Sequence, residues 1–417
     1  MKIQSKQRPS TILRFLLVLF TALLGLAAII GSGGGGGDTI PSFSLESGIA
    51  IGDLDQDGNP DIALAARYLA GPPPHPGTVY LFLQSEVNPG EFNLSSSYGV
   101  GNDPWGDLKI EDVDGDGVND IVVANSQSNS ISILYQDPGR PGNFFPARNY
   151  SGGVHPNSVA TGDLNADNII DVAVANANGI SVLFQDPVTP GSFLSTTNIV
   201  AGFPAGSVAI ADLNADGASD IAIDGDTSDI FVFFQNPFQP GEFFPPVNLP
   251  AGSYPSSVAV GDLDEDGYND IVAANRGSPS DGSNAGVSVL IQNSASPGSF
   301  LPTKNYATTN SAQKVVVEDL NGDTHLDLAV SNTTLPSGTV SVLLQDASSP
   351  GTFFPAGSYF AGFQPYFIAA KDLDRDGLAD IAVSEGPSIL FQDPNTPGTF
   401  LPISIIGNLF DSSADDD

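Results

Sequence analysis

Apolar residues in this chain form short runs that are regularly interrupted by Gly, Pro, Asp or Asn. One stretch shows the order clearly: apolar runs at 257–261, 270–274, 287–291 and 300–306 are separated by an acidic loop, a Gly- and Ser-rich loop and a Pro-Gly turn. Val, Ile and Phe dominate these runs, and small residues often alternate with them, which favours antiparallel strands over helices. No amphipathic helical pattern follows residue 30. The stretch therefore predicts four short strands.

The same order recurs seven times, and each repeat contains one loop of the form Asp-x-[Asp/Asn]-x-Asp-x-x-x-Asp, with intervals of 49 to 59 residues between loops. The loops are residues 53–61, 112–120, 163–171, 212–220, 262–270, 319–327 and 372–380. A period near 50 indicates one array of stacked units instead of several unrelated domains. Positions within these loops are numbered 1 to 9 below.

A second signature has the same register, because each predicted third strand ends with Gln and is followed by a Pro-Gly-x-Phe turn. The residues are Gln84, Gln136, Gln185, Gln235, Gln292, Gln345 and Gln392, with Phe92, Phe144, Phe193, Phe243, Phe300, Phe353 and Phe400. Seven matches in seven repeats confirm the assignment of the repeat.

A four-stranded sheet of this length cannot bury both of its faces alone, whereas seven similar sheets bury them by radial stacking. The sequence therefore predicts an all-β fold: a seven-bladed β-propeller of four-stranded antiparallel blades, with calcium-binding hairpin loops. A linear solenoid is the alternative, but it needs distinct polar caps at both ends, and none is present. Residues 40–45 and 403–406 are both candidates for the outer strand of the last blade.

The acidic loops also account for the charge of the chain. The net charge is −35 with only 13 Lys and Arg residues, which argues against a nucleic-acid or anionic-membrane binder. Four loops have Asp at positions 1, 3, 5 and 9 and three have Asn at position 3, so these four positions hold 25 of the 48 acidic residues. Seven bound divalent ions would bring the formal charge to −21, which makes bound metal a simple reason for this composition.

Oxygen-bearing side chains at every second position can gather around one hard cation, and calcium prefers such ligands. Position 7 varies freely, as expected if only its backbone carbonyl binds the ion. The predicted ligands are Asp53, Asp55, Asp57, Asn59 and Asp61; Asp112, Asp114, Asp116, Val118 and Asp120; Asp163, Asn165, Asp167, Ile169 and Asp171; Asp212, Asn214, Asp216, Ala218 and Asp220; Asp262, Asp264, Asp266, Tyr268 and Asp270; Asp319, Asn321, Asp323, His325 and Asp327; Asp372, Asp374, Asp376, Leu378 and Asp380.

Up to seven Ca²⁺ sites are therefore expected, and position 6 ranks them, since the turn there requires a positive φ. Five loops have Gly at this position, the third has Asn168 and the sixth has Thr324, so we expect the Thr324 loop to bind most weakly. Position 2 is always Leu or Val and should point into the blade. An EF-hand is excluded because position 12 is apolar instead of Glu. The alternative is that Asx hydrogen bonds alone hold these hairpins.

Residues 257–271 read Ser-Val-Ala-Val-Gly-Asp-Leu-Asp-Glu-Asp-Gly-Tyr-Asn-Asp-Ile and closely resemble the FG-GAP or VCBS-type repeats, which include the propeller of integrin α chains. The resemblance covers about residues 48–401. It implies a propeller with calcium in the hairpin loops, and it does not imply a particular ligand.

The N-terminus has Lys2, Lys6, Arg8 and Arg14, then an apolar stretch at 15–30 and a run of glycines, which resembles a secretory signal and a tether. We expect a signal peptide or N-terminal anchor at 1–32, a Gly-rich linker with a candidate closing strand at 33–45, the propeller at 46–410 and an acidic tail at 411–417. Cysteine is absent, which excludes disulfides and lipidation. A periplasmic, cell-surface or secreted bacterial protein is expected, with no membrane insertion beyond that anchor.

Strand alternation places the aspartate loops at one end of the propeller and the variable loops at the other. The longest insertions, 67–77, 276–286 and 333–338, join the second and third strands, and such loops usually carry recognition. The same end should present aromatic and histidine residues: Trp105, His155, Phe203, Tyr254 and the segment 363–366. An aromatic residue at a blade junction is more often a packing residue, and His75 and His155 are expected to be exposed loop residues.

The sequence favours a binding or adhesion scaffold for an unknown extracellular ligand, either carbohydrate or protein, and no catalytic residue is predicted. The alternative is a propeller enzyme, a lyase or hydrolase, that acts on extracellular polysaccharide. Its scattered candidate residues are Arg67, Arg276, Asp103, Asp224 and Asp226. A purely architectural surface protein is a third reading. The oligomeric state stays open.

Overall fold

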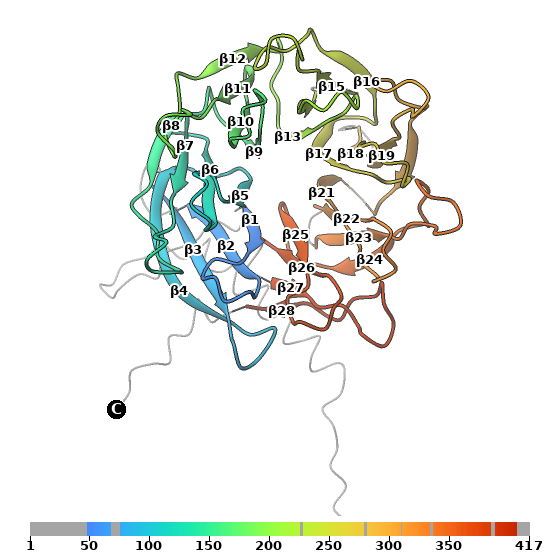
Figure 1. Ribbon diagram of the computed structural model, residues 1–417. Coiled ribbons are helices and arrows are strands. Elements are labelled where there is room, and N and C mark those ends of the chain that lie inside the picture. The colour runs from blue at the N-terminus through green and yellow to red at the C-terminus, as the bar shows by residue number, and fades with distance from the viewer. Residues whose placement is uncertain are drawn as a thin grey trace, which may run out of the picture. The chain divides into compact units, whose positions relative to one another are not determined.

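The computed structural model describes residues 48–67, 76–225, 228–278, 282–309, 311–333, 337–384 and 388–406, which form 28 strands and no helix. Within those residues, therefore, no helix is long and apolar enough to cross a membrane. The strands form seven four-stranded antiparallel sheets, each from four strands that are consecutive in the chain. Figure 1 shows these sheets as blades of a ring, with the first strand of each blade innermost. The predicted seven-bladed β-propeller is confirmed.

Blades one to four comprise β1 (Ile49–Gly52), β2 (Asp61–Arg67), β3 (Pro76–Gln84) and β4 (Phe92–Asn102); β5 (Leu108–Glu111), β6 (Asp120–Asn125), β7 (Ser130–Leu134) and β8 (Arg148–Ser151); β9 (Ser158–Gly162), β10 (Asp171–Asn176), β11 (Gly179–Leu183) and β12 (Thr197–Val200); β13 (Val208–Ala211), β14 (Asp220–Asp224), β15 (Asp229–Phe233) and β16 (Val247–Pro250). Blades five to seven comprise β17 (Pro255–Gly261), β18 (Asp270–Asn275), β19 (Gly286–Leu290) and β20 (Lys304–Ala307); β21 (Ala312–Glu318), β22 (Asp327–Asn332), β23 (Thr339–Leu343) and β24 (Gly357–Phe360); β25 (Ile368–Lys371), β26 (Asp380–Val383), β27 (Ser388–Leu390) and β28 (Ser404–Ile405).

The second strand of each blade is almost continuously apolar because neighbouring blades cover both of its faces. In β6 and β10 every position is buried, whereas the outer strand β8 is mostly exposed. Strands that are buried on both faces lose the alternation of polar and apolar residues. The outer strand that the sequence predicted at 300–306 is shorter than expected: β20 comprises only Lys304–Ala307, and Phe300 forms an isolated bridge with Gln292.

The hydrophobic core consists of seven clusters, and each cluster joins two neighbouring blades. The cluster that closes the ring contains Phe82 and Phe92 of the first blade with Leu373 and Ile389 of the last. The strand β28 pairs with β27, so the candidate at 403–406 supplies the outer strand of the last blade. The other candidate, 40–45, lies outside the described residues. The described blades close by packing, and no strand is shared between the first and last of them.

The Pro-Gly turns connect neighbouring blades in a way that the sequence did not reveal. Each turn glycine has a φ between 70° and 84°. A β-carbon built on it would lie 3.1–3.6 Å from the Cβ of the position-3 residue in the preceding blade's aspartate loop. The glycines are Gly90, Gly142, Gly191, Gly241, Gly298, Gly351 and Gly398. Seven close backbone approaches therefore press each aspartate loop against the next blade.

Gly90 makes this contact at the ring closure, where an added Cβ would meet the Cβ of Asp374 at 3.1 Å and the ring of Phe391 at 3.3 Å. We expect Gly90→Ala to lower the free energy of unfolding by about 2–4 kcal/mol, from backbone strain and crowding together. Gly202→Ala is the matched control, because Gly202 also has a positive φ (86°) but open space around it. The control should lose only about 1 kcal/mol in denaturant titrations. Equal losses in the two variants would contradict the packing role.

Candidate functional site

The aspartate loops connect the first and second strands of each blade, and the Pro-Gly turns connect the third and fourth. Because the strands are antiparallel, both groups lie at one end of the ring. The loops between strands two and three, and those between blades, lie at the other end. The predicted segregation of acidic loops from variable loops is therefore confirmed for the described residues.

The Asp at position 9 is buried in all seven loops and holds the loop to the sheet. In the sixth loop, Oδ2 of Asp327 accepts a hydrogen bond from the Leu320 N–H (3.0 Å) and Oδ1 accepts one from the Gln345 N–H (2.7 Å). The same two bonds occur in every other loop. Position 2, predicted to point inward, is 0–1% exposed throughout.

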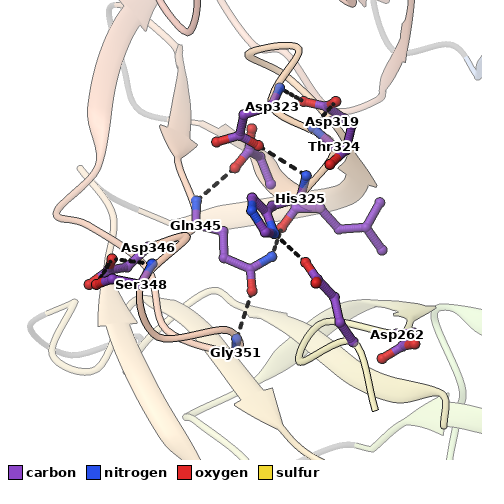
Figure 2. Close-up of polar contacts among 12 residues, drawn as sticks. Asp262, Asp319, Asp323, Thr324, His325, Gln345, Asp346, Ser348 and Gly351 are labelled. Carbon is purple, nitrogen blue, oxygen red and sulfur yellow. Dashed lines mark hydrogen bonds and ion pairs between the residues drawn. The ribbon is translucent and has the colours of Figure 1, made fainter. Parts of the chain in front are cut away.

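The repeated Gln is the second fixed point of the loop. Its side-chain Nε2 donates to the carbonyl oxygen of position 8 in all seven blades, at 2.7–3.2 Å. Its Oε1 accepts from the turn glycine N–H in four blades, as for Gln345 and Gly351 in Figure 2. The sequence predicted this Gln only as a marker of register. The structure shows that it joins the loop, the third strand and the turn.

Two further hydrogen bonds fold each loop around its own carboxylates. The position-6 N–H donates to the Asp at position 1, and the position-7 N–H donates to the Asp at position 5, both at 2.7–3.1 Å in all seven loops. Figure 2 shows these bonds from Thr324 to Asp319 and from His325 to Asp323. Asx hydrogen bonding is thus present, and it leaves other carboxylate oxygens available.

The backbone of each loop contains two residues with positive φ. Position 6 has φ between 63° and 93°, as predicted, and the β-branched Thr324 is held at 75°. Position 4 also has a positive φ, between 58° and 75°, although it includes Gln56, Glu265 and Arg375. This second left-handed position was missed, because only Gly115 and Gly322 gave any sign of it in the sequence.

Four loops bring three carboxylates close enough to share one cation. In each of them, one oxygen from each of three Asp residues lies within 4.8 Å of the others: Asp53, Asp55 and Asp57; Asp112, Asp114 and Asp120; Asp262, Asp264 and Asp270; Asp372, Asp374 and Asp380. These are the loops with four Asp ligands; the other three have Asn at position 3. These clusters can hold a metal ion.

The same four loops contain buried carboxylate oxygens without a hydrogen-bond donor, namely Oδ1 of Asp53, Asp114, Asp264 and Asp372. A buried charged oxygen without a partner is costly, and a cation in the loop would compensate for it. The donor set therefore fits a hard divalent ion on two independent grounds, the clustering of carboxylates and the unsatisfied oxygens.

Burial changes the acidity of the position-9 groups. Desolvation raises the pKa of Asp61, Asp120, Asp171, Asp220, Asp270, Asp327 and Asp380 to about 7, although the two backbone hydrogen bonds act in the opposite direction. Neighbouring loop carboxylates add a smaller upward effect. Without a bound cation, the position-9 carboxyl groups are therefore partly protonated near neutral pH, and a cation that bound there would displace these protons.

The position-7 residues do not extend the carboxylate clusters with their side chains. Val118 and Ala218 are buried, and the His325 ring contacts Glu265 of the preceding loop. Asn119 donates to the Asp53 carbonyl at 2.8 Å, and Arg375 donates to Gln84 Oε1 at 2.6 Å across the ring closure. Neighbouring loops therefore contact one another around this end of the propeller.

A pocket of about 310 Å³ lies at the opposite end, among the loops between blades. It is lined by Trp105, Asp107, Asn157, Pro204, Ala205, Gly206, Ser207, Asp224, Gly225, Tyr254, Pro255, Ser256, Arg276, Gln313, Lys314, Tyr366 and Phe367. Of the residues that the sequence singled out, five meet here: Trp105, Asp224, Tyr254, Arg276 and Tyr366 of the segment 363–366.

The other residues named for this end have different surroundings. Phe203 packs against Phe231 at the edge of a core cluster, with ring centroids 4.2 Å apart, and Asp103 pairs with Arg67 at 2.7 Å. His155 is exposed, as predicted. His75 and Asp226 lie outside the described residues.

Sequence reasoning missed the Asp107–Lys314 ion pair. These residues belong to blades two and six, near β5 and β21, which face one another across the centre of the ring in Figure 1. Nothing in the local sequence of either blade could have indicated that they meet. The ion pair therefore links opposite sides of the ring, and both of its residues line the pocket.

Solved structures share this fold at low sequence identity. A lectin of Agrocybe aegerita that recognises non-reducing terminal N-acetylglucosamine is 18% identical (TM-score 0.54; 86% of this chain and 93% of that chain). Sqt1 from Chaetomium thermophilum is 13% identical (TM-score 0.55; 86% and 88%). The V. cholerae biofilm matrix protein Bap1 is 12% identical and less similar (TM-score 0.47; 86% and 79%). No curated protein sequence matches the chain.

The family model described as an FG-GAP-like repeat matches five overlapping stretches: 112–174, 163–223, 212–273, 262–330 and 319–383. Each match begins at position 1 of one aspartate loop and ends in the second strand of the next blade. The matches together span well over half of the sequence, and they follow the observed blade repeat. The chain therefore belongs to the FG-GAP-like repeat family.

Proposed function

We propose that this propeller is an exported calcium-binding scaffold that presents a binding surface to an extracellular carbohydrate or protein. The observation that carries the calcium assignment is the coincidence of three-carboxylate clusters with buried unpartnered oxygens in the same four loops. Calcium is favoured over softer metals because every donor is oxygen and no Cys is available. The bound ion would supply positive charge to these carboxylates and thereby tighten the contact between neighbouring blades.

The separation of the two ends supports a binding role. The aspartate loops stiffen one end, and loops of different length lie at the other, around a pocket with aromatic and charged walls. The same fold serves a lectin, so a carbohydrate ligand is compatible with this scaffold. The basic N-terminus followed by an apolar stretch supports export.

We propose binding without catalysis. The enzyme alternative depends on Asp224 and Arg276, which share the pocket, whereas Asp103 is already paired with Arg67. A glycosidase needs two carboxyl groups that flank the scissile bond, and Asp107, the second acid in the pocket, is engaged by Lys314. Release of shortened or unsaturated products from a polysaccharide panel would contradict this proposal.

Calcium titration of the full chain, followed by native mass spectrometry, should show several bound ions, up to seven, with the Thr324 loop filled last. Extracellular sites bind calcium with dissociation constants of about 0.1–1 mM, so at tenfold excess each ion adds roughly 1.4 kcal/mol. Seven ions then contribute on the order of 10 kcal/mol, and we expect EDTA to lower Tm by more than about 10 °C. A metal-free folded protein in millimolar calcium would contradict the proposal.

Asp264→Ala tests one loop and keeps the backbone hydrogen bonds that the Asp262 and Asp266 carboxylates accept. Asp264 Oδ1 is buried without a donor, so its removal should leave the stability in EDTA unchanged or slightly raised. In calcium, the variant should bind one ion fewer and lose about 1–2 kcal/mol of stability relative to wild type. The control is Asp346→Ala, which removes an exposed carboxylate that caps a turn at the same end (Figure 2). A normal ion count in Asp264→Ala would contradict the assignment.

Stability should depend on pH in opposite directions with and without calcium. The position-9 groups have a folded-state pKa of about 7, above the ordinary Asp value. Their protonation stabilises the metal-free fold at acidic pH, and this stabilisation is lost as pH rises through 7. Calcium requires ionised carboxylates and so favours high pH. Between pH 5 and pH 8 we expect Tm to fall in EDTA and to rise in calcium, each by roughly 5–10 °C. Parallel melting curves would contradict the ligand role.

A further inference from the structure

The pocket at the end opposite the aspartate loops is a half-open cup around the ring axis, lined by residues in or next to the innermost strands of six blades. The Asp107–Lys314 ion pair, which joins blades two and six, is part of its lining. Asp107 also accepts a hydrogen bond from the Ser158 hydroxyl at 2.8 Å and is only 8% exposed. Three blades thus contribute to one buried polar contact. A volume of about 310 Å³ lies at the small end of ligand pockets and suits one or two sugar rings.

The charge at this end differs from that of the whole protein. The chain has a net charge of −35 and only 13 basic residues, yet Arg67, Lys109, Arg276 and Lys314 all lie in or beside this pocket. Burial raises the pKa of Asp107, but the neighbouring Lys314 and Lys109 outweigh burial and hold it below its usual value. These cations have acidic neighbours, since Arg67 pairs with Asp103, Lys314 pairs with Asp107 and Arg276 acts on Asp224. Cations thus balance the acids at this end, unlike in the chain as a whole, so an anionic group can approach the pocket.

The two acids of the pocket are already occupied as acceptors. Asp107 accepts from Lys314 and Ser158, and Oδ1 of Asp224 accepts from the N–H groups of Gly206 and Ser207 at 2.7 and 2.8 Å. Arg276 is exposed, and its charge acts on Asp224 against the burial that raises the pKa of that carboxyl. A cationic ligand would therefore find few acceptors here, whereas a carboxylate would find a fork of N–H donors.

One wall of the cup is aromatic. The rings of Trp105 and Tyr366 lie with centroids 5.8 Å apart, and the Arg67 guanidinium covers Trp105 at 5.0 Å. Tyr254 is 43% exposed at the rim. Flat aromatic faces next to polar groups such as Gln313 suit a ring with one apolar face and hydroxyls at its edge. A flexible acidic peptide would gain less binding free energy from contact with such a wall.

We propose that this axial cup binds an acidic saccharide, a uronic acid residue whose carboxylate is held by Arg276 and Lys314 and whose ring packs on the Trp105–Tyr366 wall. This inference rests on the proposed function as a binding scaffold, and it adds the ligand class and the site. The aspartate loops at the other end have no part in this contact beyond holding the ring together.

The test is isothermal titration calorimetry of the calcium-loaded full chain with trigalacturonic acid and, separately, with its methyl ester, which lacks the negative charges and adds one methyl group to each carboxyl. We expect trigalacturonic acid to bind at least tenfold more tightly than the ester, since a charge-assisted contact is worth roughly a tenfold change or more. Triglutamate, a peptide that carries the same kind of carboxylates, should bind more weakly than the saccharide.

Three variants locate the contact. Arg276→Gln and Tyr254→Ala change residues at the exposed rim and should weaken trigalacturonic acid binding by about tenfold and several-fold respectively. Arg140→Gln is the control, because this substitution removes the same charge far from the pocket. The Arg140 side chain is 78% exposed in the turn between β7 and β8, at the aspartate-loop end. Binding by this control should match wild type.

Equal binding of the acid and its ester would overturn recognition of the carboxylate, and equally tight binding of triglutamate would overturn the saccharide class. Full binding by Arg276→Gln and Tyr254→Ala would overturn the location. Ion counts on the same samples keep the two proposals separate, because a protein that binds calcium normally but ignores trigalacturonic acid refutes only the axial cup.

Discussion

The constraint on which the structure depends is the burial of seven carboxylates, one at the start of the second strand of every blade. Burial of such a group is unfavourable unless donors surround it. Each of these Asp residues receives two backbone N–H bonds, from its own loop and from the Gln that ends the third strand. The acid therefore defines where the loop ends, where the second strand begins and how the third strand is placed beside it.

This local arrangement affects the whole ring because each aspartate loop also contacts the next blade. The next blade's turn glycine lies against the position-3 residue, at distances that would make even an added methyl group a tight fit in most blades. The hydrophobic clusters follow the same plan, since every one of them joins two blades. Under the proposed function, an ion in one loop stiffens the boundary between two sheets and not merely a hairpin. A blade on its own would bury little, which is typical of repeat proteins.

Much of the fold could be predicted because each blade repeats the same local chemistry. The loop spacing, the inward Leu or Val at position 2 and the positive φ at position 6 all follow from residue types that have a strong physical preference. Position 4 could not be predicted, since Gln56 and Arg375 adopt positive φ only because the surrounding loop imposes it. The Asp107–Lys314 pair was also beyond prediction: it joins residues 207 positions apart through the closure of the ring, which no local pattern encodes. Local periodicity thus predicts the blades, and only the assembled ring creates the axial cup.

The way the ring closes has a further consequence. Each described blade takes all four of its strands from one continuous segment, and Ile49 and Ile406 lie in the same cluster, so the two ends of the propeller meet at an ordinary blade boundary. The blade at which the chain begins therefore affects how the blades are connected, and it has little effect on how they pack. A circularly permuted gene that begins at another interblade loop would encode the same set of sheets, and duplication of one unit would add or exchange whole blades without splitting a strand ladder.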